Sequence, residues 1–197
     1  YAGITKSFAV TPIAGNHDYS TEGARPFREA FLLPENGGEQ GHERWFSFDW
    51  SQVHFVALDT EVIGPEQAAW LDADLSANQK PWTIVYAHKP AFSSGEHGSD
   101  YEVRQVFHPI LQKHRVPLVL NGHEHDYERT TPQDGVTYIV TGGGGRGTRA
   151  VGSSTFTAFS EDVLHFVQVE VHEQELFVHA IDGVGREFDS LRLARNR

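Results

Sequence analysis

The chain has 197 residues, of which 39% are hydrophobic and 22% are charged, a composition typical of a soluble globular protein with a sizeable core. Sixteen Lys and Arg residues against 27 Asp and Glu residues give a net charge of -11, which argues against a nucleic-acid polymer or an anionic membrane as partner. The absence of cysteine excludes disulfides and thiolate metal sites, and no apolar run approaches the roughly 20 residues of a membrane span.

The spacing of apolar residues predicts strands that alternate with helices in the first two thirds of the chain. We expect strands at 8–14, 45–50, 53–58, 82–87 and 117–120, and helices at 24–33, 65–77 and 101–114. After a strand at 136–141 and four glycines, alternating residues predict two half-buried antiparallel strands at 163–171 and 176–181. With no repeat and no linker, residues 1–197 are expected to form a single α/β domain.

Three of the expected strands end in residues that commonly bind metals. The segment 15–18 reads Gly-Asn-His-Asp, His88 follows the strand at 82–87, and the segment 122–125 reads Gly-His-Glu-His. Because sites in open α/β sheets gather beyond the carboxyl ends of the strands, we expect an amide oxygen and several imidazoles to meet in one crevice. This combination predicts a metal site.

The spacing of His123 and His125 supports the same prediction. On an extended segment, residues two apart point to the same side, so the two rings would serve one metal or two adjacent ones. A zinc-protease helix is excluded, because Tyr127 occupies the position of the second histidine in the H-E-x-x-H pattern. The remaining histidines away from these loops are expected to be structural: His42, His54, His108, His114, His165, His172 and His179.

These segments resemble the calcineurin-like metallophosphoesterases, and in particular the purple acid phosphatase branch. The resemblance rests on the Gly-Asn-His-Asp segment, on Ala-His-Lys-Pro at 87–90, on Gly-His-Glu-His with its Asp-Tyr-Glu-Arg-Thr tail, and on Tyr-Ile-Val-Thr at 138–141 running into glycines. It implies a four-layer sandwich of two mixed β-sheets flanked by helices. It also implies hydrolysis of small phosphomonoesters by a hydroxide activated at two metal ions, iron with zinc or manganese.

The resemblance assigns roles to individual residues. Asn16, His88 and His123 would bind the second metal and His125 the first. His17 matches the family histidine that contacts the phosphate and protonates the leaving oxygen. For His97 two interpretations stay open, a second substrate-facing histidine or a solvated loop residue. Substrate choice is expected in the loops 93–100 and 142–149, where Arg146 is a further candidate contact.

The two earliest family motifs, which carry the bridging aspartate, have no counterpart before Gly15, because residues 1–14 contain no Asp, Glu or His. The chain also lacks methionine and begins at Tyr1, so we expect a processed or truncated product, the C-terminal portion of a full catalytic domain. Taken alone, it would bind at most one metal and show weak or no activity. Exposed sheet edge and apolar surface would favour an associated N-terminal fragment or self-association.

Three functional hypotheses follow. The first is a metal-dependent phosphomonoesterase, and the second a phosphodiesterase or nucleotide hydrolase of the same class. The third is a catalytically silent scaffold that keeps a partial metal site; the missing aspartates favour it, whereas the retained His17 argues against it. The resemblance and the absent start methionine together suggest a secreted or periplasmic protein.

Overall fold

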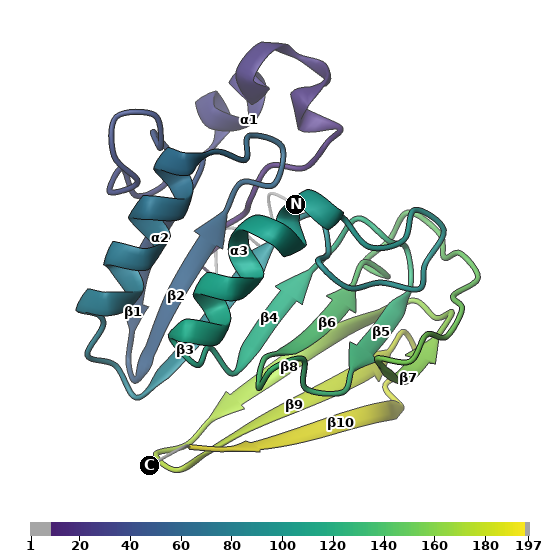
Figure 1. Cartoon of the computed structure of the whole chain (residues 1–197). Coiled ribbons are helices and arrows are strands. Elements are labelled where there is room, and N and C mark those ends of the chain that lie inside the picture. The colour runs from purple at the N-terminus through teal and green to yellow at the C-terminus, as the bar shows by residue number, and fades with distance from the viewer. Residues whose placement is uncertain (1–8, 196–197) are drawn as a thin grey trace.

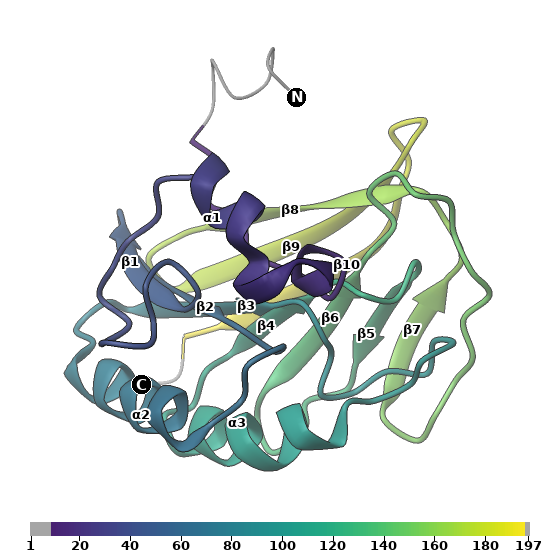
Figure 2. The ribbon, with the colours of Figure 1, turned by 90° about the horizontal axis from the view of Figure 1, so that it is seen from above.

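The computed structural model describes residues 9–195, which form two packed β-sheets with helices on one side (Figure 1). Seen from above, the helices α2 and α3, the large sheet and the small sheet make three successive layers (Figure 2). The fold class predicted from the sequence, a mixed α/β sandwich of two sheets with flanking helices, is confirmed. Residues 9–195 supply three of its four layers.

The large sheet has seven strands, in the order β1-β2-β3-β4-β6-β5-β7. A tight hairpin joins β1 to β2, which then runs parallel to β3, β4 and β6, while β5 and β7 are antiparallel. The parallel strands therefore all end at one edge of the sheet. The strands are β1 (Phe46–Trp50), β2 (Val53–Leu58), β3 (Trp82–Ala87), β4 (Leu118–Asn121), β5 (Tyr127–Thr130), β6 (Thr137–Thr141) and β7 (Thr157–Glu161).

The helices α2 (Pro65–Ala77) and α3 (Tyr101–Lys113) cover one face of this sheet. Proline at the first turn of α2 and the Asp100 side chain, which accepts a hydrogen bond from Val103 N, fix the two helix starts. Alternate strand residues such as Val85 and Val119 pack against buried Leu71 and Phe107. Within residues 9–195, no helix is long and apolar enough to cross a bilayer.

The opposite face of the sheet carries a small antiparallel sheet of three strands, in the order β10-β9-β8. Its strands are β8 (His165–Val171), β9 (Glu175–Asp182) and β10 (Glu187–Ala194). Ile84 and Leu118 pack on Leu176 and Val178 of this small sheet. Each directly precedes in sequence a residue that faces the helices. The period-two alternation of each parallel strand thus divides its apolar residues between two cores.

The structure corrects two of the predicted elements. Residues 9–14 of the expected strand at 8–14 form an irregular segment, and Phe8 lies outside the described residues. No strand of residues 9–195 pairs with this segment to complete a ladder. The expected helix at 24–33 is the shorter α1 (Arg25–Ala30), preceded by the 3-10 turns η1 (Asp18–Ser20) and η2 (Glu22–Ala24). The strands β5, β7 and β10 were not predicted.

Beside the small sheet, the same face of the large sheet holds an open apolar groove of about 800 Å³. Side chains of four neighbouring strands line it, among them Phe48, Phe55, Ile84 and Leu120. Trp50, also in the lining, is 67% exposed. The exposed apolar surface expected from the sequence is therefore present, while association through it remains a prediction.

Candidate metal centre

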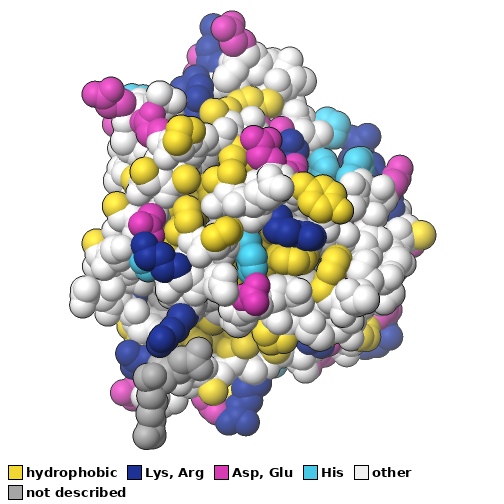
Figure 3. Space-filling model, viewed as in Figure 1, with side chains coloured by type: hydrophobic (Ala, Val, Ile, Leu, Met, Phe, Trp, Pro, Cys, Tyr) yellow, Lys and Arg dark blue, Asp and Glu magenta, His cyan; other side chains and the backbone are white. Residues whose placement is uncertain are grey.

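Three of the predicted metal ligands meet at the carboxyl ends of β3 and β4. His88 follows β3 directly, and its Nε2 lies 2.8 Å from Asn16 Oδ1 and 3.1 Å from His123 Nδ1. The His88 and His123 rings meet edge to face, with centroids 5.0 Å apart. Histidine side chains gather at this upper end of the molecule (Figure 3). One amide oxygen and two imidazole nitrogens thus converge from three separate segments of the chain.

The imidazoles at this point are held in the neutral form that binds metals. Burial, followed by the charges of the neighbouring His123 and Lys89, lowers the pKa of His88 to about 4. Burial also lowers the pKa of His123, with His97 adding to the effect. The pKa of His125 is lowered by burial and by the charge of Arg149. At neutral pH these rings therefore offer lone pairs rather than positive charge.

The segment that carries His123 is a tight turn, not the extended backbone assumed from the sequence. His123 has φ +70°, and Glu124 N donates to the carbonyl of Gly122 at 2.9 Å. Such a left-handed conformation is uncommon for a residue with a side chain and is concentrated at functional sites. The turn directs His123 toward His88. Among the described residues, no hydrogen bond or ring contact joins His125 to His123 or His88.

His97, whose role the sequence left open, lies beside the histidine cluster. Its ring centroid is 4.6 Å from that of His123, and its Nδ1 lies 3.2 Å from the carboxylate of Glu124. Ligand atoms of His97, His123 and Glu124 all lie within 4.8 Å of one another. Glu124 was not among the site residues predicted from the sequence, although its place between two histidines was a signal.

His17 and His125 are placed at the rim of the cluster. His17 is exposed, and its charge helps to lower the pKa of His88, as a residue close to that ring would do. The backbone carbonyl of His125 accepts a hydrogen bond from Arg149 N at 2.9 Å. Arg149 also pairs with Glu96 at 3.2 Å. The loops 93–100 and 142–149 therefore meet beside the site, where substrate choice was predicted.

After His123, the acidic side chains and the side chains between them lie on opposite sides of the segment. Glu124, Asp126 and Glu128 are buried beneath the loop 93–97, where Glu128 accepts hydrogen bonds from Ser94 N and Ser94 Oγ at 2.6 and 2.8 Å. Both carboxyl oxygens of Asp126 are buried without a partner among the described residues. Burial, then the charges of Glu124 and Glu128, raise the pKa of Asp126 to about 7, so it takes up a proton near neutral pH.

The intervening residues of this segment face the small sheet. Arg129 donates to both carboxylate oxygens of Asp189, at 2.7 and 2.8 Å, and Tyr127 Oη donates to the same carboxylate at 2.7 Å. Asp189 belongs to β10, so this buried ion pair ties the large sheet to the small one. The Tyr-Glu-Arg tail therefore supports the metal-site turn from both faces of β5.

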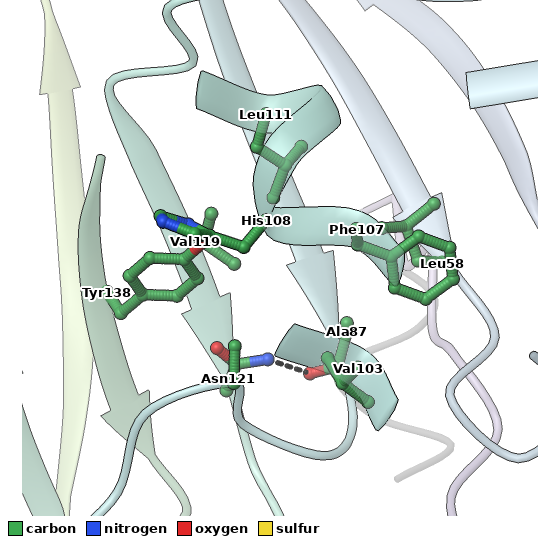
Figure 4. Close-up of a pocket in the computed structure, with 10 residues that line it drawn as sticks. Leu58, Ala87, Val103, Phe107, His108, Leu111, Val119, Asn121 and Tyr138 are labelled. Atoms are coloured by element: carbon green, nitrogen blue, oxygen red, sulfur yellow. Dashed lines mark hydrogen bonds between the residues drawn. The ribbon is translucent and has the colours of Figure 1, made fainter. Parts of the chain in front are cut away.

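Asn121, the last residue of β4, holds the backbone on both sides of His88. Its Nδ2 donates to the carbonyls of Ala87 and Lys89, each at 3.1 Å. Figure 4 shows Asn121 beside a cavity under α3, lined mainly by apolar side chains such as Val103, Phe107 and Leu111. At about 10 Å³ this cavity has room for about one water molecule. It belongs to the core and is not a ligand site.

Most histidines predicted to be structural have hydrogen-bond partners away from the site. The ring of His54 contacts Asp49 and Asp74, and that of His108 contacts Tyr138 and Asp134. The others with ring partners are His114 with Asp72, His165 with Thr141 and the Val163 carbonyl, and His179 with Glu187.

The converging donors fit one metal ion. His88 Nε2 lies within hydrogen-bond distance of both Asn16 Oδ1 and His123 Nδ1, and this mixed oxygen and imidazole set suits zinc, iron or manganese. A second ion would need carboxylates that this set does not contain.

Comparisons with known proteins agree with this chemistry. The sequence model of the family described as calcineurin-like phosphoesterase matches residues 3–127. Purple acid phosphatase 23 of Arabidopsis thaliana is 31% identical over 161 residues, covering 72% of this chain and 35% of that protein. The probable inactive purple acid phosphatase 1 of the same plant is 26% identical over 232 residues, covering 93% of this chain and 37% of that protein.

A purple acid phosphatase from yellow lupin (Lupinus luteus) seeds has a solved structure with the same fold. It matches with a TM-score of 0.82 at 23% identity, over 95% of this chain and 38% of that chain. The chain thus spans little more than a third of the length of these relatives.

Proposed function

This chain belongs to the calcineurin-like phosphoesterase family, and we propose that it provides one half of the metal centre of a phosphomonoesterase. The observation that carries the proposal is the contact of His88 Nε2 with both Asn16 Oδ1 and His123 Nδ1, at the ends of two parallel strands. A metal ion bound there would act as a Lewis acid toward a phosphoryl oxygen and lower the pKa of a water molecule.

The surrounding side chains have roles that need no metal of their own. His17 is exposed beside Asn16 and is proposed to protonate the leaving oxygen of the ester. His97 is proposed to face the phosphate, with Glu124 accepting from its Nδ1 and thereby presenting Nε2 to the substrate. The guanidinium of Arg149, next to His97, adds positive charge where the phosphoryl group would lie.

Four expectations from the sequence remain proposals. The ion is proposed to be zinc, iron or manganese. A second ion, bound by His125 together with carboxylates from an associated chain segment, would complete the two-metal centre. A secreted or periplasmic location remains a prediction, as does an associated N-terminal fragment.

The test is hydrolysis by the chain purified together with any segment that stays bound to it, after loading with Zn²⁺, Mn²⁺ or Fe³⁺, because one half of the metal centre alone is expected to show weak or no activity. We expect p-nitrophenyl phosphate to be hydrolysed faster than bis(p-nitrophenyl) phosphate, and His17→Ala to lower kcat by about 100-fold while metal content stays unchanged. Preference for the diester would favour the phosphodiesterase hypothesis. Stable metal binding without hydrolysis of either ester would favour the silent scaffold, an alternative supported by the likeness to a probable inactive phosphatase.

A further inference from the structure

A surface hollow with a basic lining is formed by residues 21–28, which follow the loop of Asn16 and His17, together with Arg44. It has a volume of about 500 Å³, and its lining includes three arginines, Arg25, Arg28 and Arg44, with Glu22 as the one acidic residue among the described lining residues. Such a concentration of positive charge is unexpected in a chain with a net charge of -11. Nothing in the proposed phosphoester chemistry uses these arginines.

Two of the guanidinium groups converge on one point of the hollow. A Cβ atom placed on Gly23 would lie 3.3 Å from Arg44 Nη2 and 3.5 Å from Arg28 Nη2. Gly23 has φ +59°, a conformation that glycine adopts without strain. The glycine therefore leaves open the space that both guanidinium groups border.

Arg28 and Arg44 have no carboxylate within ion-pair distance among the described residues, whereas Arg25 pairs with Glu29 at 3.5 Å. Burial raises the pKa of Asp59 and the charge of Arg44 opposes that rise, so Asp59 is the nearby acidic group that Arg44 influences. Arg28 Nε donates to the carbonyl of Gly23 at 3.0 Å, and its outer nitrogens form no hydrogen bond with the residues that the structure describes. Arg44 Nε is buried and has no acceptor among the described residues. Adjacent guanidinium groups without a carboxylate are stabilised when an anion binds between them.

The hollow lies close to the loop that bears Asn16 and His17. Tyr19, two residues after His17, donates a hydrogen bond to Asp59, which directly follows β2. Burial raises the pKa of the Tyr19 phenol most strongly, whereas the positive charges of Arg44 and Arg28 oppose the rise. Both guanidinium groups are therefore within electrostatic range of Tyr19. The helix α1, which contains Arg28, lies beyond the carboxyl ends of the parallel strands, at the same end of the sheet as the metal site (Figure 1).

We infer that Arg28 and Arg44 form an anion subsite that binds a second phosphate group of the substrate. This inference rests on the proposed function for its substrate, since the first phosphate would be the ester at the metal site. Planar guanidinium groups bind the oxygens of a phosphate in pairs, which an ammonium group cannot do. The substrate class is thus a phosphoester that carries at least one more phosphate.

A binding experiment tests the subsite without any catalysis. In metal-free, low-salt buffer containing EDTA, isothermal titration calorimetry with inorganic tripolyphosphate should show saturable binding that weakens as salt is added. Arg44→Gln and Arg28→Gln should each lower the affinity by at least about tenfold. Arg192→Gln, which removes the same charge from β10, is the matched control and should change the affinity less than about twofold.

Two results would overturn the subsite. One is no binding by the natural chain, and the other is equal affinity in Arg28→Gln, Arg44→Gln and Arg192→Gln. Thermal melts of each variant show whether the fold is intact; if Arg44→Gln is destabilised, the comparison rests on Arg28→Gln.

A kinetic experiment separates a substrate subsite from a site for free phosphate. In the metal-loaded protein, Arg28→Gln should lower kcat/KM for a bisphosphorylated ester such as fructose 1,6-bisphosphate by at least about tenfold and leave that for p-nitrophenyl phosphate unchanged. Equal loss for both substrates would contradict a substrate subsite. If neither substrate is hydrolysed by any variant, the proposed function fails, while the calorimetry still decides whether the arginines bind an anion.

Discussion

The imidazole of His88 packs directly on Gly15, so closely that a Cβ atom at residue 15 would lie 2.7 Å from its Cε1. The same ring contacts Asn16 through Nε2. The residue before Asn16 therefore has to be glycine for the loop to bring its amide oxygen to the imidazole. The Gly-Asn pair acts as a unit with a histidine 72 positions later in the chain.

Substitution of this glycine should disrupt the metal site selectively. In Gly15→Ala, the added methyl group would displace the His88 ring from Asn16, which we expect to weaken Zn²⁺ binding at least about tenfold at a stability cost of about 1–3 kcal/mol. Gly64→Ala is the matched control, because a Cβ there meets nothing within 4 Å. Calorimetry with Zn²⁺ measures both variants, and unchanged affinity in Gly15→Ala would contradict this role.

Asn121 is expected to act on metal binding by positioning His88. Asn121→Ala removes the two hydrogen bonds to the carbonyls of Ala87 and Lys89. We expect a loss of about 2 kcal/mol in unfolding free energy and about tenfold weaker Zn²⁺ binding. Asn78→Ala removes hydrogen bonds to Thr83 and Lys80, near the start of β3, and should lower stability without altering Zn²⁺ affinity. Equal effects of both variants on Zn²⁺ would refute a positioning role.

The ion pair between Arg129 and Asp189 should be a main link between the two sheets. Both side chains are largely buried, with 18% and 8% exposed, so Asp189→Asn leaves the guanidinium without a counter-charge. We expect a loss of about 3 kcal/mol in unfolding free energy, measured by urea denaturation. The exposed pair of Arg192 and Glu175 provides the comparison, and Glu175→Gln should cost less than about 1 kcal/mol. Similar costs for the two variants would contradict the account.

His54 should make the stability of the chain depend on pH. Burial alone would lower the pKa of His54, but hydrogen bonds to Asp74 and Asp49 outweigh it and raise the pKa. Since the folded pKa lies above the ordinary value, the stabilisation is fully present below about pH 6.5 and is lost as the pH rises through the folded pKa.

The variant His54→Gln measures this contribution. Its unfolding free energy should fall below that of the natural chain by more at about pH 5.5 than at about pH 9. His172→Gln, at a ring that is 61% exposed, should show no such dependence. A larger loss of unfolding free energy at high pH than at low pH in His54→Gln would contradict a raised pKa of His54 in the folded chain.

Much of the site's framework could be predicted from the sequence. The strands β3 and β4 are mostly apolar and lead to His88 and to the His123 segment, and parallel strands place such ends together. The turn at His123 could not be foreseen, because a left-handed histidine has no local sequence signal. It is held by hydrogen bonds to residues far away in the chain.

The missed strand β5 shows a second limit. Its sequence Tyr-Glu-Arg-Thr is polar and was not predicted to be a strand, yet three of its four residues are buried. The polar side chains of β5 have hydrogen-bond partners in distant parts of the chain. Tyr127 and Arg129 donate to Asp189, and Glu128 accepts from Ser94. Local periodicity cannot reveal charges that are neutralised by distant residues.

The most direct test of the account is Zn²⁺ binding to the purified chain, measured by calorimetry and elemental analysis. We predict about one ion per chain, with the affinity lowered at least about tenfold in both His88→Gln and His123→Gln and unchanged in the control His172→Gln. Zn²⁺ binding that is equally strong in all four proteins, or absent from the natural chain, would contradict a metal centre at Asn16, His88 and His123.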